Sequence, residues 1–372
     1  MFQRIKALFR AGERRSVGLD HALTMLLGGT PTHSGVTISA ETAMRCTPVY
    51  AAVKVLAETV AQLPVHLYRR LPDGGRERAE NHPVYALLAD AANGWTPASE
   101  FRLVMQTHLS LHGNAFAYVG REAGAVNELI PLDPRSVSVE SDRVTMEPIY
   151  YVTDAGGTRH DYSRTDILHI RGIGIRPHVG VSPVEQAREA VALSIVLEQH
   201  GAGLFGRGAR PAGVLKYPHA LNADILARLR ASFESMYRGG ENSGKTAILE
   251  SGMEFQPLQL SSVDAQYLEL RKFQLQEIAR IFRVPLHLLA DLDRTTHSNA
   301  EALGQQFLTF CLLPILKLWR DALQITLLTP DERREYYIEF LVDDLARADL
   351  AARFTAYSQA INSGVFNPNE IR

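Results

Sequence analysis

The amino-acid sequence predicts an α+β protein in which long helices stand before and after a segment rich in short strands. Residues 48–61 and 182–205 carry apolar residues at helical spacing, whereas residues 114–170 consist of short apolar runs broken by Gly, Asp and Pro. A chain of 372 residues is long enough for two or three domains with their own cores. Its hydrophobic content of 46% is ordinary for a globular protein.

The charge balance and the cysteine content exclude several kinds of site. The formal net charge at pH 7 is −2, and a protein that grips DNA phosphates usually carries a clear basic excess. We therefore expect any DNA to pass this protein rather than be held by it. Cys46 and Cys311 fit no disulfide or metal framework and are expected to be buried. No window approaches 18 apolar residues, so no membrane span is expected.

The first part of the chain predicts an arm followed by helices and a strand. Residues 1–43 are irregular and begin with a basic, weakly amphipathic stretch, which is typical of a flexible arm. Residues 48–61 predict a helix with Pro48 in its first turn. Residues 63–70 alternate like a strand, and two further helices are predicted at 82–89 and 97–111.

The helix predicted over residues 182–205 combines a capped start with apolar side chains on most of its faces. Ser182 is placed to cap it, Pro183 takes the first position, and Glu185 completes a capping box. Apolar residues, among them Leu193, Val196 and Leu197, fall on nearly every face. Such a helix is buried on several sides, as in a helix packed into an oligomer.

The second half of the chain predicts an α+β insert and then more helices. The insert, 207–258, contains strands and one helix over 222–237. A long helix with a kink at Pro314 is expected over 299–328. It is followed by a strand at 334–342 and a helix at 345–361.

The stretch from Leu268 to Asn299 is the most distinctive in the chain. It predicts an amphipathic helix whose apolar positions include Phe273, Ile278 and Phe282. Pro285 ends that helix because it lacks an N–H and disfavours helical geometry at the residue before it. A loop of turn formers and capping residues follows, which contains Asp293, Arg294, Thr295, Thr296, His297 and Ser298.

A phosphate-binding motif occurs in an unfavourable setting. Residues 239–246 match the pattern Gly-x-x-x-x-Gly-Lys-Ser/Thr in full, ending in Lys245 and Thr246. The mechanism requires a strand before the loop and a helix after it, so that backbone amides face the phosphates. Here a predicted helix precedes the motif and a strand follows it. We interpret Gly239 and Gly240 as a helix end instead.

The thirteen histidines do not predict a metal or catalytic centre. His108 and His112 are four residues apart, but no Glu lies between them and they straddle the end of a predicted helix. His66 and His169 lie in strand patterns and are expected to be structural. Only His297, in the polar loop, is a candidate functional residue. We expect no enzymatic activity, no catalytic residue, no cofactor and no metal.

Several segments, taken in order, resemble portal proteins of tailed bacteriophages. They run from TPVYAAVKVLAETVAQLPVHLYRR through HPVYALL, LHGNAFAYV, DILHIRG, VGVSPVEQAREAV and GARPAGVL to RKFQLQEIARIFRVPLHLL and SNAEA, and finish with NPNEIR. Each piece is moderately specific, and their common order is highly specific. The resemblance covers roughly residues 47–370.

The resemblance implies a ring of subunits, each with a wing, a stem, a clip and a crown. By position, residues 1–43 would be the arm and 44–175 the wing. The remaining assignments implied by the resemblance are a first stem helix at 182–205, a clip at 207–258, a second stem helix at 264–284, a tunnel loop at 286–298, a long helix and returning wing strand at 299–344, and the start of the crown at 345–372.

The resemblance also implies site residues and partners. The loop residues 293–298 would face a DNA channel, and the stem contacts between subunits would involve Leu193, Val196, Leu197, Phe273, Ile278 and Phe282. The implied partners are eleven further copies of the chain, double-stranded DNA, the major capsid protein, the terminase large subunit and a head-tail adaptor protein. The implied location is the portal vertex of the virion, and the host cytoplasm during assembly.

Two other classes of function compete with this interpretation. The phosphate-binding motif would suit a P-loop NTPase of the packaging-motor type, which measured ATP turnover would support. A capsid or tail adaptor without a DNA channel would share the assembly helices. A closed ring with a pore wide enough for a duplex would exclude that adaptor.

Overall fold

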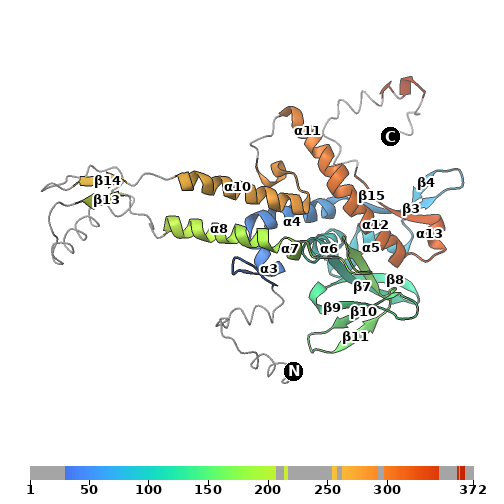
Figure 1. The fold of residues 1–372 in the computed structure, drawn as a ribbon. Coiled ribbons are helices and arrows are strands. Elements are labelled where there is room, and N and C mark those ends of the chain that lie inside the picture. The colour runs from blue at the N-terminus through green and yellow to red at the C-terminus, as the bar shows by residue number, and fades with distance from the viewer. Residues whose placement is uncertain are drawn as a thin grey trace. The chain divides into compact units, whose positions relative to one another are not determined.

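The computed structural model describes residues 30–206, 213–216, 254–257, 262–291, 297–342, 358–359 and 361–364. The chain divides into two compact units, Met1–Ile195 with Phe273–Arg372 and Val196–Lys272. Helices and antiparallel sheets both occur, and Figure 1 shows their order along the chain. The predicted mixture of helix and sheet is confirmed.

Two helices, α4 (Thr47–Gln62) and α6 (Ala98–His112), pack against each other in the first unit. Both were predicted. α6 ends at Gly113, whose φ of 71° lies in the left-handed region that favours glycine at a helix end. Arg102 is buried between them and donates to the backbone oxygens of Ala61 and Leu88. It thereby ties α6 to the end of α4 and to α5 (Pro83–Ala89).

Three antiparallel sheets of three strands complete most of the first unit. β3 (Val65–Arg70) lies between β4 (Arg76–Arg78) and β15 (Tyr336–Phe340). The strand predicted near residue 334 therefore returns to the N-terminal part of the chain. The strands predicted over 114–170 form two sheets, β12-β7-β8 (Ile167–Arg171, Asn114–Glu122, Ala125–Leu132) and β11-β10-β9 (Arg159–Tyr162, Pro148–Thr153, Val137–Ser141).

Short elements join these parts. Two strand pairs are small, β1 (Thr30–Pro31) with β2 (Thr37–Ile38) and β5 (Ala91–Asn93) with β6 (Thr96–Pro97). One-turn elements include α3 (Ala40–Ala43), η1 (Pro134–Ser136) and α13 (Glu332–Glu335).

Two apolar clusters hold the first unit together. The first contains Trp319, which is completely buried and donates its indole N–H to the side-chain oxygen of Gln106 at 2.8 Å. The second gathers residues from distant segments, including Cys46, Ile278 and Cys311. The expectation that both cysteines are buried is confirmed.

The helix predicted over 182–205 is interrupted. It consists of α7 (Pro183–Gln186) and α8 (Arg188–Gly206), with Ala187 between them outside helical geometry. The hydroxyl of Ser182 caps α7 as predicted, accepting from the Glu185 N–H at 3.1 Å, and donates to the Leu111 carbonyl at 2.6 Å. Ala187 is packed into the second cluster, so tertiary contacts rather than residue type place the break.

The helix predicted over 299–328 begins earlier and is irregular. α11 (His297–Gln306) starts two residues before the expected position, and a π-helical turn, η4 (Phe307–Leu312), separates it from α12 (Leu313–Leu327). The predicted kink at Pro314 therefore takes the form of a widened turn directly before it. Pro314 lacks an N–H and its ring crowds the preceding turn, which disfavours regular α-helix there.

Composition alone does not overturn the expectation that the chain has no membrane span. One described helix, Ala302–Leu327, is long and apolar enough to cross a membrane by length and composition, and a third of its most apolar window is buried. The helix contains no unbroken run of 18 apolar residues, and its most apolar window includes polar side chains. Leu316, Trp319 and Leu323 of this helix lie in the first cluster, so one side of the helix packs into the core.

The second unit contains one described strand pair and the ends of two helices. β13 (Gly213–Lys216) and β14 (Glu254–Pro257) pair antiparallel. The hydroxyl of Tyr267, in α10 (Ser262–Phe282), donates to the Leu197 carbonyl at 2.7 Å. The phosphate-binding motif, the predicted helix at 222–237 and most of the predicted C-terminal helix lie outside the described residues.

Candidate functional site

Residues with positive φ follow the end of α10 and the end of the short turn after it. α10 stops at Phe282, and Arg283 adopts a φ of 55°. The N–H of Val284 then bonds to the Ala279 carbonyl at 3.1 Å, and Pro285 begins a short 3-10 turn, η3 (Leu286–Leu289). Ala290 has a φ of 63°. The predicted stop at Pro285 is confirmed, and the chain leaves the helix along one defined path.

The start of the loop is anchored in the second apolar cluster. Ile278 is fully buried there, and Phe282 and Val284 are 7% and 3% exposed. The thiol of Cys311, in η4, donates to the Phe282 carbonyl at 3.6 Å. η3 also lies against α4. The helix before the loop and the π-helical turn after it therefore share one packed base.

Charges on α10 are mixed in sign. Arg280 forms an ion pair with Glu277 and lies over the Phe273 ring, 5.7 Å from its centroid. Other aromatic side chains of α10 also have partners within the chain, since the Tyr267 hydroxyl donates to the Leu197 carbonyl and Phe282 is buried.

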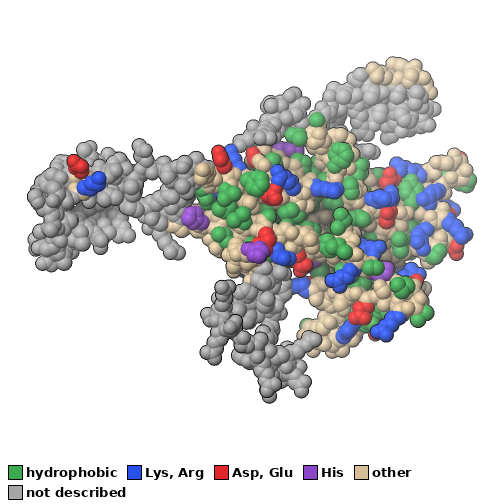
Figure 2. All heavy atoms as spheres, in the orientation of Figure 1, with side chains coloured by type: hydrophobic (Ala, Val, Ile, Leu, Met, Phe, Trp, Pro, Cys, Tyr) green, Lys and Arg blue, Asp and Glu red, His purple; other side chains and the backbone are tan. Residues whose placement is uncertain are grey.

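Opposite charges also alternate elsewhere on the surface. In Figure 2, Lys and Arg side chains intermingle with Asp and Glu around β3, β4 and α13. The contacts there include pairs of Arg69 with Glu77 and Glu335, and of Arg76 with Glu339. This intermingling agrees with the net charge of −2 and differs from a phosphate-gripping surface.

The histidines singled out by sequence occupy structural positions. His169 donates its Nε2–H to the Asn114 side-chain oxygen at 3.1 Å and accepts at Nδ1 from the Tyr150 hydroxyl at 3.2 Å, and burial lowers its pKa to about 3. His66 contacts the Tyr85 hydroxyl at 3.3 Å. His108 and His112 both lie on α6 with ring centroids 6.4 Å apart, and burial lowers the pKa of His108 to about 4. Among the described residues, no three His, Cys, Asp or Glu side chains are grouped to hold a metal.

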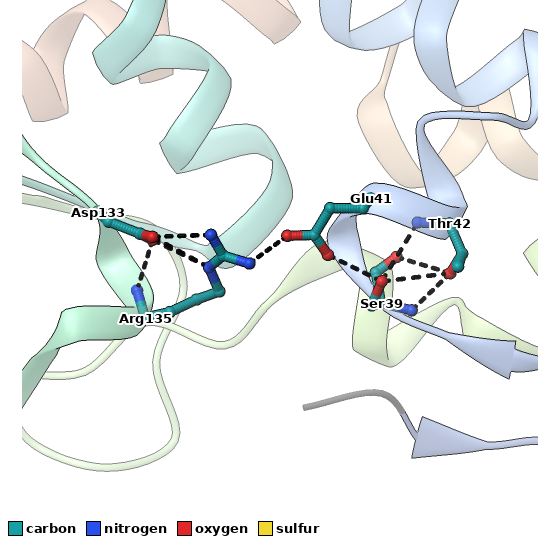
Figure 3. A network of polar contacts seen from close by, with 5 residues as sticks. All are labelled: Ser39, Glu41, Thr42, Asp133 and Arg135. Carbon is teal, nitrogen blue, oxygen red and sulfur yellow. Dashed lines mark hydrogen bonds and ion pairs between the residues drawn. The ribbon is translucent and has the colours of Figure 1, made fainter. Parts of the chain in front are cut away.

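A polar network beside these histidines was not predicted. Figure 3 shows Arg135 between Asp133 and Glu41, which joins η1 to α3. The Ser39 hydroxyl donates to Glu41 at 2.9 Å, and hydrogen bonds from Arg135 lower the pKa of Asp133. The network forms one wall of a hollow of about 640 Å³ that His108 and His112 also line. The polar side chains of this network bond to one another, so the network has a structural role.

The arrangement of a buried helix end, a polar loop and a kinked returning helix can be compared with known families. The family model described as phage portal protein matches residues 47–372. The chain belongs to the phage portal protein family.

Curated portal proteins and solved structures are similar over most of the chain. It is 30% identical to the probable portal protein of Streptomyces phage phiC31, with 92% of this chain and 77% of that protein covered. It is 27% identical to the portal protein of Enterobacteria phage HK97, covering 90% and 79%. A chain from the neck of an empty gene transfer agent particle has the same fold, with a TM-score of 0.70 at 23% identity over 94% of this chain and 96% of that one.

The tip of the loop in this portal family member lies largely outside the described residues. Asp293, Arg294, Thr295 and Thr296 fall in that gap. The backbone of His297 and Ser298 forms the first turn of α11 rather than the end of a loop. The predicted channel role of these residues stays a prediction.

The predicted stem residues of the portal subunit divide into two groups. Leu197, Ile278 and Phe282 are buried within the chain, and Val196 is half-buried. Leu193 and Phe273 are 37% and 47% exposed. α10 exposes two further apolar residues, Leu268 and Leu270, which are two positions apart and therefore on different faces of the helix. Exposed apolar side chains on these helices are available to other molecules.

Proposed function

We propose that copies of this chain form a closed ring around a DNA channel at one capsid vertex, through which double-stranded DNA is packaged and ejected. Membership of the phage portal family over residues 47–372 carries this proposal. Support also comes from similarity of fold to a chain in the neck of a gene transfer agent particle computed with C12 symmetry, at a TM-score of 0.68. We propose twelve subunits on that basis.

We further propose the domain assignment that the sequence suggested. The wing would comprise 44–175 and the returning strand within 299–344, the stem 182–205 and 264–284, and the clip 207–258. The tunnel loop would be 286–298, and 345–372 would begin the crown. The anchored helix end at Phe282 and Val284 supports this assignment, because a loop that contacts moving DNA requires a fixed base.

The proposed loop chemistry is weak and exchangeable attraction for phosphates. Arg294 is the permanent cation at the tip of the loop and His297 is the other side chain of the tip that can become cationic, while Asp291 and Asp293 beside them have the opposite charge. Opposed charges and solvent screening make each contact weak. A ring offers equivalent contacts on every subunit, so DNA can exchange one for the next as it moves. A strongly basic collar would instead hold the DNA.

The proposal is tested by two charge changes in the loop. Asp293→Lys should slow or stall packaging in a purified procapsid assay, because it adds a cation to every subunit and removes an anion. Arg294→Ala is the matched change, since it removes a cation that attracts phosphates and adds no charge. It should have the smaller effect. A larger defect in Arg294→Ala would contradict the weak-contact mechanism. Electron microscopy of the ring should place residues 293–298 nearest the symmetry axis.

The proposed partners follow from a position at the capsid vertex. They are the major capsid protein around the ring, the terminase large subunit during packaging and the head-tail adaptor protein afterwards. Assembly would take place in the host cytoplasm. Co-purification of each partner with the assembled ring, but not with a chain that fails to assemble, would support these assignments.

A further inference from the structure

A cavity of about 520 Å³ lies where α4, α6, α7, the end of α10 and α12 meet within the first unit. Its volume falls in the range of roughly 300–1,000 Å³ that is usual for sites that bind small organic molecules. The floor of the cavity is buried, with Leu109, Phe282 and Cys311 only 4–7% exposed. Its rim is open to solvent, since Ile173 and Leu318 are 79% and 39% exposed. A small molecule can therefore enter from water and contact a buried apolar floor.

The charge at the cavity has one sign. Arg283 is the one charged residue among the described residues that line it, and its exposed side chain has no acidic partner among them. The Cys311 thiol at the floor adds no charge at neutral pH, because burial raises its pKa to about 11. The Arg283 cation acts on that thiol in the opposite direction, so its charge reaches the floor. The cavity therefore favours an anion.

The backbone holds Arg283 at a fixed point on the rim. Its φ of 55° lies in the left-handed region, which glycine and asparagine adopt at a lower cost in conformational energy. Phe282 before it and Val284 after it are both buried. Since its two neighbours are anchored in the core, the turn presents the guanidinium group beside the cavity at a defined place.

A buried hydroxyl group offers a second polar contact inside the cavity. Ser110 is 5% exposed and lines the floor. Its oxygen accepts from the Gln106 side-chain amide at 3.1 Å, and Gln106 accepts from the Trp319 indole at 2.8 Å. The hydroxyl proton of Ser110 has no acceptor among the described residues. A buried donor without an acceptor is unfavourable, and an oxygen atom of a ligand would satisfy it.

We propose that this cavity binds a small amphipathic organic acid, in which an alkyl or aromatic body carries one carboxylate, sulfonate or phosphate group. The apolar body would contact Leu109, Phe282 and Leu318. The acid group would pair with the Arg283 guanidinium at the rim, where water can reach its remaining oxygens. The inference goes beyond the proposed function and does not depend on it, because every group of the site lies within one chain.

An aromatic sulfonate tests the site in the purified full-length chain. The fluorescence of 1-anilinonaphthalene-8-sulfonate rises in apolar surroundings, and we expect saturable binding of one dye per chain. N-phenyl-1-naphthylamine has the same aromatic body without the sulfonate. It should bind at least roughly tenfold more weakly, because it cannot form the charge-assisted hydrogen bond.

Variants of Arg283 locate the acid group. Arg283→Asn removes the cation and suits the left-handed backbone, so the variant should stay folded by circular dichroism. It should bind the sulfonate at least roughly tenfold more weakly. Arg283→Lys keeps the charge and should restore most of the affinity. Arg280→Asn is the matched control, since Arg280 is an exposed cation of the same helix that does not line the cavity, and it should bind like the natural chain.

Variants of α12 locate the apolar body. Leu318→Trp should weaken dye binding at least roughly tenfold, because the larger ring occupies space at the rim that the ligand needs. Leu313→Trp is the matched control, since Leu313 is 42% exposed on the same helix and does not line the cavity. Hydrogen exchange should also slow on dye binding at the last turn of α10 and at η4, which both line the cavity.

Other results would overturn the proposal. Unchanged affinity in Arg283→Asn, or equal affinity for the neutral dye, would contradict the preference for an acid. Unsaturable binding of many dyes per chain would show only scattered exposed apolar side chains. Exclusion of the dye from assembled rings would assign the cavity to a contact between subunits instead. None of these results bears on the proposed portal function, which the loop variants test separately.

Discussion

At the scale of single residues, buried histidines are the clearest source of pH dependence. Burial lowers the pKa of His108 to about 4 and that of His169 to about 3, from an ordinary 6.5. Between these values the unfolded chain binds protons that the folded chain does not. Stability is therefore fully present above pH 6.5 and falls as the pH decreases, by up to about 1.4 kcal/mol per pH unit for each histidine.

We expect His108→Phe to reduce this pH dependence. The Nδ1 atom of His108 has no hydrogen-bond partner among the described residues, so replacing the ring with an apolar one of similar shape should leave stability at pH 7 unchanged or higher. Urea unfolding of the monomer at pH 7 and pH 5 measures the difference. His33→Asn, at an exposed side chain, is the control and should behave like the natural chain. An unchanged pH dependence in His108→Phe would show that this histidine is not the group responsible.

At the scale of elements, α8 is expected to contribute to assembly through its exposed side. Leu193 is 37% exposed, whereas Leu197 is buried within the chain. Leu193→Asp should therefore leave the monomer folded and raise the concentration needed for assembly at least roughly tenfold, because a carboxylate would be buried at every contact. Val196→Asp should act in the same direction and also destabilise the monomer, since Val196 is half-buried.

Sedimentation velocity over a concentration series distinguishes these outcomes. Glu198→Gln is the matched control, because Glu198 is exposed further along the same helix and the change adds no charge. Full rings from Leu193→Asp at ordinary concentration would remove α8 from the interface.

At the scale of the whole molecule, the phosphate-binding motif is expected to have no role in packaging. Lys245 lies in a stretch predicted to follow a helix and precede a strand, which is the reverse of the order that cradles phosphates. Lys245→Ala should leave assembly and packaging nearly unchanged, because the order of helix and strand does not suit a nucleotide. Equilibrium binding of labelled ATP to the natural chain should be undetectable. A packaging defect that parallels lost ATP affinity would support the motor hypothesis.

Local chemistry made much of the fold predictable. Pro285 ends α10 because its missing N–H and ring are incompatible with a continuing helix, whatever the surroundings. Ser182 caps α7 and Pro48 lies in the first turn of α4 for similarly local reasons. Helical and strand periodicities placed α4, α6 and the strands over 114–171, and the order of the family segments identified the chain as a portal protein.

Contacts between distant residues decided the remainder. The break at Ala187 and the exposure of Leu193 beside buried Leu197 depend on what packs against each position. The sequence alone determined which residues are apolar, where most helices and strands lie and to which family the chain belongs. Only the tertiary structure decided which apolar side chains are left uncovered. Apolar burial depends on neighbours brought together from across the chain, as Ile173 and Leu318 are, and no local pattern records them.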